Sequence, residues 1–527
     1  MFVCTLWRYV VCATVLYPVS TLNNAEFKQS YWQHNAMTSL KEALKMKLNT
    51  NVAKNVILFL GDGMGISTIT GATIYKGQKA KQSGEEQNLI FQKFPHVALI
   101  KTYSVDMQVS DSAATATAFL TGVKTRNEML GLTADATVGN CNSVINNEVH
   151  SIMKWAQDEG KDTGFVTTTR VTHATPAALY AHSPDRDWEN DAQLPKNATK
   201  CKDIARQLVE DIPGRESKVI FGGGRRHFMT KNMSDVEDQM KGGRQDGRDL
   251  IKLWKNDKQQ RGFTHRYVTN LEEFLQIDPE KTDFVMGLFA FDHMQYEADR
   301  DKTKEPSIAE MTEKAISVLK KNDKGYFLLV EGGRIDHAHH NTMAAKALED
   351  TVAMADAVQK AVEITDQKDT LIIVTADHSH VLTINGYPKR GNSLLGIAGV
   401  SDIDKKSYTT LMYTNGPGQE DYNVSRADTK DQNTTSFDYT QQTTVPLKFE
   451  THGGEDVALF ATGPMAHLFH GVKEQNYIAY AMGYASCVGP NKEHCCHGTC
   501  LDSSAAIIHS SLLINIGMAI VLWVSSF

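Results

Sequence analysis

Acidic and histidine side chains gather in this chain where one buried strand is expected to end and a helix to begin. The apolar run of residues 326–330 has the length of a buried strand, and residues 343–364 carry apolar side chains at helical spacing. The ten residues after the first run read EGGRIDHAHH. Asp336 and His340, four residues apart, share one face if the helix has begun, and Glu331 leaves from the end of the strand. This stretch has the residues of a metal site. Taken alone, it fits a solvated helix start equally well.

The same pattern recurs at three other apolar runs of strand length, residues 56–60, 370–375 and 457–461. Open α/β sheets bind ligands beyond the carboxyl ends of their strands, so these segments are expected to meet at one edge of a sheet. Imidazole with carboxylate suits zinc, whereas carboxylate, hydroxyl and water suit magnesium. The recurrence therefore favours a metal centre. The side chains that border these runs are Asp62, Asp377, His378, His380 and His452.

The order of strand-like and helical runs predicts an α/β fold, with a large central sheet flanked by helices on both faces. Residues 386–448 interrupt this rhythm, because they are rich in Gly, Ser, Thr and Asn and show little periodicity, and we interpret them as a surface insertion or a small lid domain. The predicted organisation is a signal peptide (1–20), an N-terminal arm (21–50), an α/β core (51–385 and 449–490) divided by the insertion (386–448), a Cys-rich tail (491–503) and a C-terminal propeptide (504–527).

Composition narrows the class of protein. The chain has 527 residues, which is enough for one large core or two domains. Hydrophobic residues make up 41% and charged residues 22%, as is usual for a soluble globular protein. The formal net charge is −7 and there is no long basic run. We therefore expect no nucleic-acid partner.

Both ends of the chain have features of an exported protein held at a membrane. Residues 1–20 combine a basic residue with an apolar core, as a secretory signal does, with a buried N-terminal helix as the alternative. Near the other end, small residues at and after Ser503 precede a short spacer and the apolar residues 512–524. That tail is shorter than the roughly 20 residues of a spanning helix. The pattern predicts a GPI lipid at Ser503 and a location on the extracellular face of the plasma membrane, with a short true anchor as the alternative.

Cysteines and glycosylation sequons agree with export. Six cysteines remain after the presumed signal, an even number that is typical of disulfides in an exported chain. A metal knuckle formed by Cys495, Cys496 and His497 is the alternative for part of this set. Four sequons for N-glycosylation begin at Asn197, Asn232, Asn423 and Asn433.

Ser112 is the candidate nucleophile. It precedes a run of small residues that predicts a helix, so it is expected at or near the N-cap, beside Asp111. Backbone N–H groups and the helix dipole bind phosphate there, and a neighbouring metal ion would activate the hydroxyl. An ordinary cap serine is the alternative. His173 and Thr175 follow another strand-like run, and Arg186 carries a fork that can hold two oxygens of a terminal phosphate.

Six motifs follow one another as they do in the animal alkaline phosphatases, and the chain resembles that family over roughly residues 40–490. The motifs are DGMG from Asp62, DSAAT from Asp111, THATPA from Thr172, EGGRIDH from Glu331, TADHSH from Thr375 and THGGED from Thr451. The resemblance implies an α/β sandwich with a crown insertion, a homodimer, and hydrolysis of small phosphate monoesters by two in-line displacements through a phosphoserine.

The resemblance also implies two Zn²⁺ and one Mg²⁺ per subunit. By motif, the first zinc takes Asp336, His340 and His452. The second zinc takes Asp62, Asp377 and His378, with Ser112 as the phosphoryl acceptor. The magnesium takes Asp62, Thr175 and Glu331. Asp111 and Arg186 would position the phosphate, and His173 would lie near the magnesium's waters. His337 is expected beside the site, and His339 and His380 receive no metal.

Three further features come only from the resemblance. It implies disulfide-bonded cysteines at Cys141, Cys201, Cys487 and Cys495, with Cys141 paired to Cys201. It implies that Tyr387 reaches the neighbouring subunit's site. Ala290 stands where many animal relatives carry an acidic ligand for calcium, so a calcium site is not implied for this chain.

Two rival readings use the same framework. A sulfatase needs a modifiable residue in a Cys-x-Pro-x-Arg-like setting, which the residues around Ser112 lack. A phosphodiesterase has no use for an arginine that holds two free phosphate oxygens. The non-enzymatic rival is a surface-anchored binding protein with an inactive site, although every ligand type is present.

Overall fold

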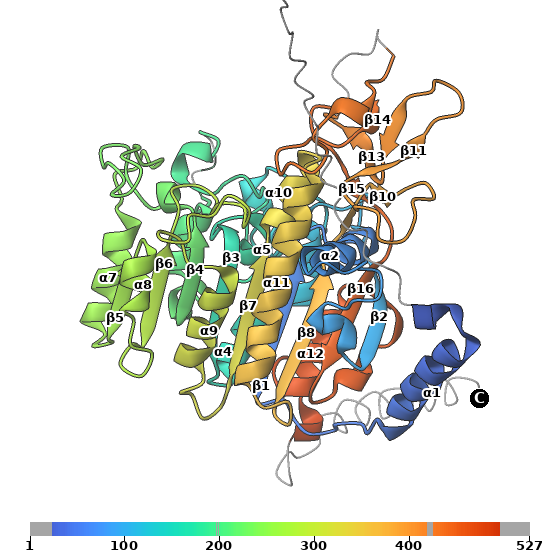
Figure 1. Cartoon of the computed structure of the whole chain (residues 1–527). Coiled ribbons are helices and arrows are strands. Elements are labelled where there is room, and N and C mark those ends of the chain that lie inside the picture. Colours follow the sequence, from blue (N-terminus) through green and yellow to red (C-terminus); the bar gives the residue numbers. More distant parts are fainter. Residues whose placement is uncertain (1–23, 197, 199, 419–424, 496–527) are drawn as a thin grey trace, which may run out of the picture.

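A mixed sheet of ten strands forms the centre of the protein (Figure 1). The computed structural model describes residues 24–196, 198, 200–418 and 425–495. The strands of this sheet are β1 Asn55–Gly61, β2 His96–Lys101, β3 Asp162–Arg170, β4 Val219–Gly223, β5 His265–Val268, β6 Phe284–Leu288, β7 Tyr326–Gly332, β8 Thr370–Ala376, β16 Val457–Thr462 and β17 Gly471–Glu474. Their order is β17-β2-β16-β8-β1-β7-β3-β4-β6-β5. Within this sheet β16 runs antiparallel to β2 and β8, and the other neighbouring strands are parallel.

The three central strands confirm the apolar runs that the sequence singles out. β7 and β8 are buried throughout, and β1 is buried after Asn55, as expected for parallel strands that are covered on both faces. Leu60 of β1 is level with Glu331 of β7 and with Thr375 of β8. Because these strands are parallel and in register, the polar residues that follow them leave the sheet side by side.

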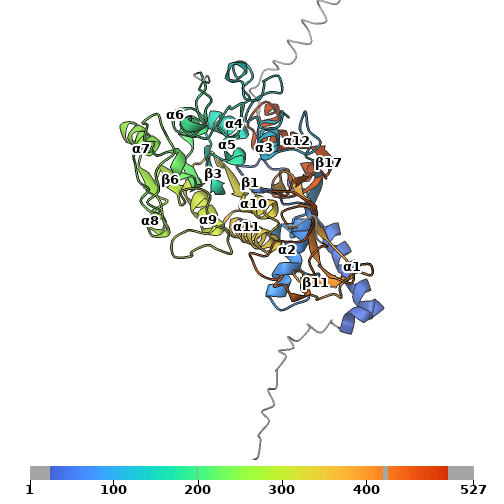
Figure 2. The same cartoon turned by 90° about the horizontal axis from the view of Figure 1, so that it is seen from above.

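Helices cover both faces of the sheet, as predicted (Figure 2). One face carries α2 Ile66–Lys79, α9 Ile308–Leu319, α10 Arg334–His340 and α11 Ala344–Ile364; the other carries α3 Ser112–Thr121, α4 Ile152–Asp158 and α12 Tyr477–Ser486. Every residue of α3 is buried, which its small Ala and Thr side chains permit at close packing. The remaining α-helices are α5 Ala174–Ala177, α6 Ile204–Glu210, α7 Leu250–Gln260 and α8 Leu271–Leu275.

Short 3₁₀ turns occur along the whole described chain. They are η1 Asn24–Phe27, η2 Ile90–Lys93, η3 Cys141–Ser143, η4 Asp191–Gln193, η5 Gly214–Glu216, η6 Arg225–His227, η7 Thr429–Asp431, η8 Ala466–Leu468 and η9 Glu493–Cys495. No strand or helix was predicted for residues 225–307, yet α7, β5, α8 and β6 lie there. β5 is short and half-exposed at the sheet edge, so it lacks the apolar run that marks the central strands.

The insertion lies beyond the carboxyl ends of the central strands (Figure 1). The sequence analysis expected little regular structure there, but the segment contains strands. β13 Leu411–Gly416 and β14 Thr443–Pro446 form a small sheet with β10 Leu382–Ile384, which lies just before the predicted start of the insertion, and β11 Ile397–Val400 pairs with β12 Ser407–Thr409. At its base, β9 Ser379–His380 pairs antiparallel with β15 His452–Gly453, which places His380 opposite His452.

The predicted arm contains helix α1 Gln29–Lys45, which stands away from the body of the protein (Figure 1). None of its residues is buried, and its apolar side chains lie in solvent, with Trp32 56% and Leu44 77% exposed. These apolar side chains are left uncovered by the described part of the chain.

Disulfides join Cys141 to Cys201 and Cys487 to Cys495. The first is the pairing that the resemblance implied. Asn232 and Asn433 are exposed. No helix among the described residues is long and apolar enough to cross a membrane. The signal peptide, Asn197, Asn423, Ser503 and the C-terminal propeptide lie outside the described residues.

Candidate metal centre

The polar residues predicted at the strand ends do meet at one edge of the sheet. Asp62 follows β1, Asp377 and His378 follow β8, and α10 carries Asp336 directly beyond β7. His452 arrives from the far side of the insertion through the β9–β15 pair. The rings of His378 and His452 stack with centroids 3.5 Å apart, although 74 residues separate them in the chain.

Asp336, His340 and His452 form the first cluster of this centre. Asp336 Oδ1 lies 3.3 Å from His340 Nε2 and 3.4 Å from His452 Nε2, and the two Nε2 atoms are 3.2 Å apart. Two nitrogens bound tetrahedrally at about 2.0–2.1 Å from one zinc lie roughly 3.3 Å apart. Both Nδ1 atoms instead face backbone carbonyls, of Glu450 at 2.6 Å and of Ser110 at 2.8 Å. A carbonyl accepts only, so each Nδ1 holds the proton and each Nε2 keeps a free lone pair for a cation.

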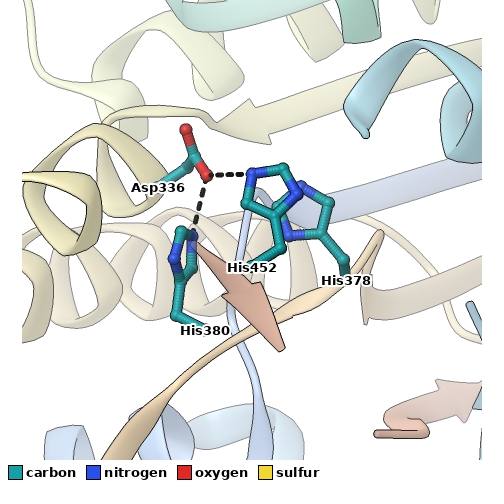
Figure 3. Close-up of side chains that lie close together, drawn as sticks. All are labelled: Asp336, His378, His380 and His452. Carbon is teal, nitrogen blue, oxygen red and sulfur yellow. Dashed lines mark hydrogen bonds and ion pairs between the residues drawn. The ribbon is translucent and has the colours of Figure 1, made fainter. Parts of the chain in front are cut away.

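His380 lies against the same carboxylate but plays another part (Figure 3). Its Nε2 is 2.8 Å from Asp336 Oδ1, and its Nδ1 contacts Glu450 Oε2. Burial alone would lower the pKa of this ring, but Glu450 and Asp336 outweigh it and raise the pKa to about 10. Both nitrogens therefore donate, and neither has a lone pair for a metal.

Asp62, Asp377 and His378 form the second cluster, beside Ser112. His378 Nε2 lies 3.5 Å from Asp62 Oδ1, 3.3 Å from Asp377 Oδ2 and 3.3 Å from Ser112 Oγ. His378 Nδ1 contacts the Ser379 carbonyl at 3.2 Å, which again leaves Nε2 as the free lone pair. Backbone N–H groups of Gly63 and His378 donate to Asp377 Oδ1 and turn its Oδ2 toward the cluster.

Asp62, Glu331 and His173 form a third group, whose ligand atoms lie within 4.8 Å of one another. Asp62 and Glu331 are fully buried, yet both Asp62 oxygens and Glu331 Oε1 accept no hydrogen bond from any described residue. The Thr175 hydroxyl faces Glu331 and is likewise buried without a partner among the described residues. Buried oxygens without donors are costly, and a cation ligated by oxygen would satisfy them.

The buried carboxylates of the three clusters also favour the binding of cations. Burial raises the pKa of Asp62 well above its usual value, and the carboxylates of Asp377, Asp336 and Glu331 raise it further. Burial likewise raises the pKa of Glu331 to about 7, against a hydrogen bond from Thr167. Burial acts in the same direction on Asp336, but the facing His340, His380 and His452 hold its pKa well below the usual range. Bound cations would remove this crowding of acids.

Ser112, Asp111 and Arg186 meet beside the second cluster. The structure refines the sequence expectation, because Asp111 is the N-cap of α3 and Ser112 is its first helical residue. Asp111 Oδ1 accepts from Ala114 N at 3.1 Å, and Oδ2 accepts from Arg186 at 3.1 Å. Arg186 also donates to His173 Nε2 at 3.3 Å. One carboxylate thus fixes both the helix start and the guanidinium that stands beside Ser112.

The other predicted residues have separate surroundings. His337 accepts from Arg334 at 2.8 Å and contacts the His173 ring. Tyr387 is fully exposed in the single chain and lies in no cluster. The sequence analysis did not single out Glu450 or His293, which pack against His380 and His173. Glu450 stands beside the TH pair of the last motif, but nothing in its local sequence marks it as a partner of a histidine seventy residues earlier.

Comparisons with known proteins agree with this geometry. The family model described as alkaline phosphatase matches residues 53–488, most of the chain. The chain belongs to the alkaline phosphatase family. The tissue-nonspecific alkaline phosphatase of Rattus norvegicus is 53% identical over 479 residues, 88% of this chain and 90% of the relative. That of Homo sapiens is 50% identical over 500 residues, 92% and 94% of the two chains. A membrane-bound alkaline phosphatase of Bombyx mori is 41% identical over 499 residues, 93% and 90%.

Solved alkaline phosphatases share the fold. The enzyme of the Antarctic bacterium TAB5 aligns with a TM-score of 0.58 at 24% identity, over 84% of this chain and all of that one. The Thermus thermophilus enzyme aligns with a TM-score of 0.60 at 24% identity, over 83% and 92%. The predictions of family, of fold class and of phosphomonoesterase activity are therefore confirmed, and the inactive binding protein is not favoured.

Proposed function

We propose that this alkaline phosphatase holds two Zn²⁺ and one Mg²⁺ and hydrolyses phosphate monoesters through a phosphoserine at Ser112. The observation that carries the proposal is the set of free Nε2 lone pairs and unpartnered buried oxygens around that hydroxyl. Two clusters combine carboxylates and imidazoles, the mixture that zinc prefers, and Asp62, Thr175 and Glu331 offer oxygens, which magnesium prefers.

Each of the three clusters would hold one ion. Asp336, His340 and His452 would hold the first zinc. Asp62, Asp377 and His378 would hold the second, and Asp62 would be shared with the magnesium ligands Thr175 and Glu331. When bound, these cations lower the pKa of the nucleophile and of the attacking water and neutralise charge that develops on phosphate oxygens. His380 does not ligate; it donates to Asp336 and orients that carboxylate.

The protein's own groups account for the order of events at phosphorus. Ser112 loses its hydroxyl proton to solvent and its Oγ attacks phosphorus, the bond to the alcohol oxygen breaks, and that oxygen takes up a proton from water as the phosphoryl group passes to the serine. Water then attacks the phosphoserine from the side that the alcohol has left, which releases phosphate and restores the hydroxyl. Two such displacements fit one fixed nucleophile at a helix start, where backbone N–H groups also favour the phosphate.

Arg186 orients the substrate. Its guanidinium is tied to Asp111 through one nitrogen and to His173 through another, so the fork is fixed before substrate arrives. A monoester has three phosphate oxygens without organic substituents, so one can face the metal ligands while two match the fork, whereas a diester has only two in all. This contact explains a preference for monoesters and leaves the alcohol unspecified.

Metal analysis and trapping of the covalent species test the proposal together. Purified protein should contain zinc and magnesium near two and one per chain, and a chelator should abolish activity. Acid quenching with a ³²P-labelled monoester should label wild-type protein. Ser112→Ala should lose both the label and turnover while keeping its metal content. A Ser112→Ala protein that is still labelled, or a fully active protein without zinc, would contradict the proposal.

A homodimer is part of the same proposal. Val97, Leu99 and Val472 lie exposed on neighbouring strands at the sheet edge, in addition to the exposed apolar side of α1. A second copy of the chain would cover such surfaces. Light scattering during size-exclusion chromatography should give twice the chain mass, and removal of residues 24–50 should shift the protein toward monomer. A monomer at micromolar concentration would refute this part.

We also propose glycosylation at the exposed Asn232 and Asn433 and a GPI lipid at Ser503. The short apolar tail and the small residues before it support the lipid. Phosphatidylinositol-specific phospholipase C should release activity from intact cells into the supernatant. Activity that stays with the membrane, on a chain that still contains the tail, would contradict the lipid anchor.

A further inference from the structure

Three imidazole rings pack together directly beside the third group of ligands. His293, from the loop between β6 and α9, contacts His337 at 4.3 Å and His173 at 5.5 Å between ring centroids. His173 and His337 are 5.4 Å apart. The three contacts are edge-on or steeply tilted, with interplanar angles of 67° to 78°. His173 therefore has two rings against it, which together restrict its own ring plane.

The hydrogen bond from Arg186 determines whether His173 can bind a metal ion. A guanidinium has no acceptor, so His173 Nε2, at 3.3 Å from Arg186, accepts with its lone pair. In the neutral ring the proton then sits on Nδ1. Neither nitrogen is free to bind a cation while this hydrogen bond is made. His173 can become a ligand only if its ring turns away from Arg186.

The orientation of His173 thus bears on which metal the third group prefers. With His173 held aside, the group offers oxygens from Asp62, Thr175 and Glu331, and such a set with added waters suits magnesium. If the ring turned inward, a nitrogen would join these oxygens and the set would suit zinc. A fixed His173 ring therefore leaves the third site with oxygen ligands only, unlike the two sites that include imidazole ligands.

Hydrogen bonds to β3 fix the position of His293, so its ring can restrict the rotation of the His173 ring. Its Nδ1 accepts from the Arg170 backbone N–H at 3.2 Å, at the end of β3. In the neutral ring Nε2 then carries the proton, so the neighbouring Arg170 guanidinium packs against the ring without a hydrogen bond to it. Arg170 in turn pairs with Glu189 at 2.7 Å. The neighbouring Met294 N donates to Thr168 O at 3.1 Å, which pins the loop to the same strand. The ring is anchored to the sheet rather than to a free loop.

We propose that His293 is a positioning residue that fixes the His173 ring and thereby keeps the third metal site selective for Mg²⁺ over Zn²⁺. The inference rests on the proposed three-metal function, and it assigns a role to a residue outside every motif of the sequence analysis. His293 touches neither substrate nor metal; it acts through the ring of His173.

Metal content, rather than activity alone, tests the role. Full-length protein is stripped with a chelator, reloaded in a fixed mixture of Mg²⁺ and Zn²⁺, desalted and measured by mass spectrometry of the elements. The His293→Ala variant should show a fall of roughly tenfold in the ratio of magnesium to zinc at the third site, the scale on which residues behind metal ligands act. The His293→Phe variant, which keeps a ring against His173, should retain most of the wild-type ratio.

A matched control separates this role from general loosening of the fold. His265 also makes an edge-on ring contact, with Trp254 at 5.8 Å, but it lies on β5 at the far edge of the sheet. His265→Ala should leave the metal ratio unchanged. An unchanged ratio in His293→Ala, or an equal fall in His293→Phe, would overturn the proposal. A wild-type protein that binds neither ion would instead overturn the proposed function, so the two failures are distinguishable.

Discussion

Replacement of Arg186 by alanine is expected to remove most of the discrimination between phosphate monoesters and diesters. In the folded protein Arg186 already donates to Asp111 and His173, and its side chain is 18% exposed. A monoester presents two free oxygens to this fork, whereas a diester presents one oxygen fewer. The variant should therefore lose far more activity on the monoester than on the diester of the same aryl alcohol.

The expected size follows from the contacts that are lost. Two hydrogen bonds from a charged donor contribute roughly 1.5–3 kcal/mol each, or about 3–6 kcal/mol together. At about 1.4 kcal/mol per factor of ten, this corresponds to roughly 10²- to 10⁴-fold in kcat/KM. Water can reach a partly exposed site and replace part of the interaction, so the lower half of that interval is expected. The carboxylate of Asp111 is then left without its cation beside the incoming phosphate, which adds repulsion.

Steady-state kinetics on the paired aryl substrates measure the effect. Arg186→Lys keeps the charge but not the fork, and should recover only part of the loss. The double variant Arg186→Ala with Asp111→Asn should be more active than Arg186→Ala alone, because the unpaired carboxylate is gone. The reasoning is refuted if monoester and diester activities fall by the same factor, or if the double variant is no better than the single one.

Three further outcomes are expected. Burial raises the pKa of Asp350 to about 8 in the folded chain, whereas an unfolded chain loses this proton above about pH 4. Between about pH 4 and pH 8 the folded state therefore binds more protons, so the free energy of unfolding falls as the pH rises. Asp350→Asn should remove this loss, so its free energy of unfolding in denaturant at about pH 9 should exceed that of the wild type by on the order of a few kcal/mol, with little difference near pH 4. Equal unfolding curves at both pH values would contradict the prediction. Serine at both Cys141 and Cys201 opens a loop with a sequence separation of 60 residues and should lower the free energy of unfolding by about 4 kcal/mol, and an unchanged urea midpoint would contradict the estimate. Replacing His340 with alanine should lower the zinc content by about one equivalent, and full zinc content would exclude it as a ligand.

The central sheet and the residues at its strand ends were accessible from the sequence for a simple reason. Strands buried on both faces read as continuous apolar runs, and in parallel register they deliver the next residues to one edge. β1, β7 and β8 therefore appeared within one or two residues of their bounds. Short or half-exposed strands lack that signal, which explains why β5 and the strands of the insertion were missed.

The partners of the candidate ligands were not accessible in the same way. His380 meets Glu450 because two short strands, β9 and β15, pair across the base of the insertion. A strand of two residues has no periodicity to detect. His293 likewise reaches His173 through a loop whose path depends on a hydrogen bond to β3. Such contacts depend on tertiary structure and leave no pattern in the local sequence.

Helical geometry explains how α10 distributes its three histidine rings and its acid. Successive residues turn by about 100° around a helix, so Asp336 and His340 lie within roughly 40° of one another and both face the first cluster. His337, one residue after Asp336, points to His173 instead. His339 points to the other side, where it contacts Thr68 at 3.0 Å and Tyr413 at 2.7 Å. The four-residue spacing was therefore the informative part of the motif, because it separates the two candidate ligands from two histidines that contact neighbouring side chains.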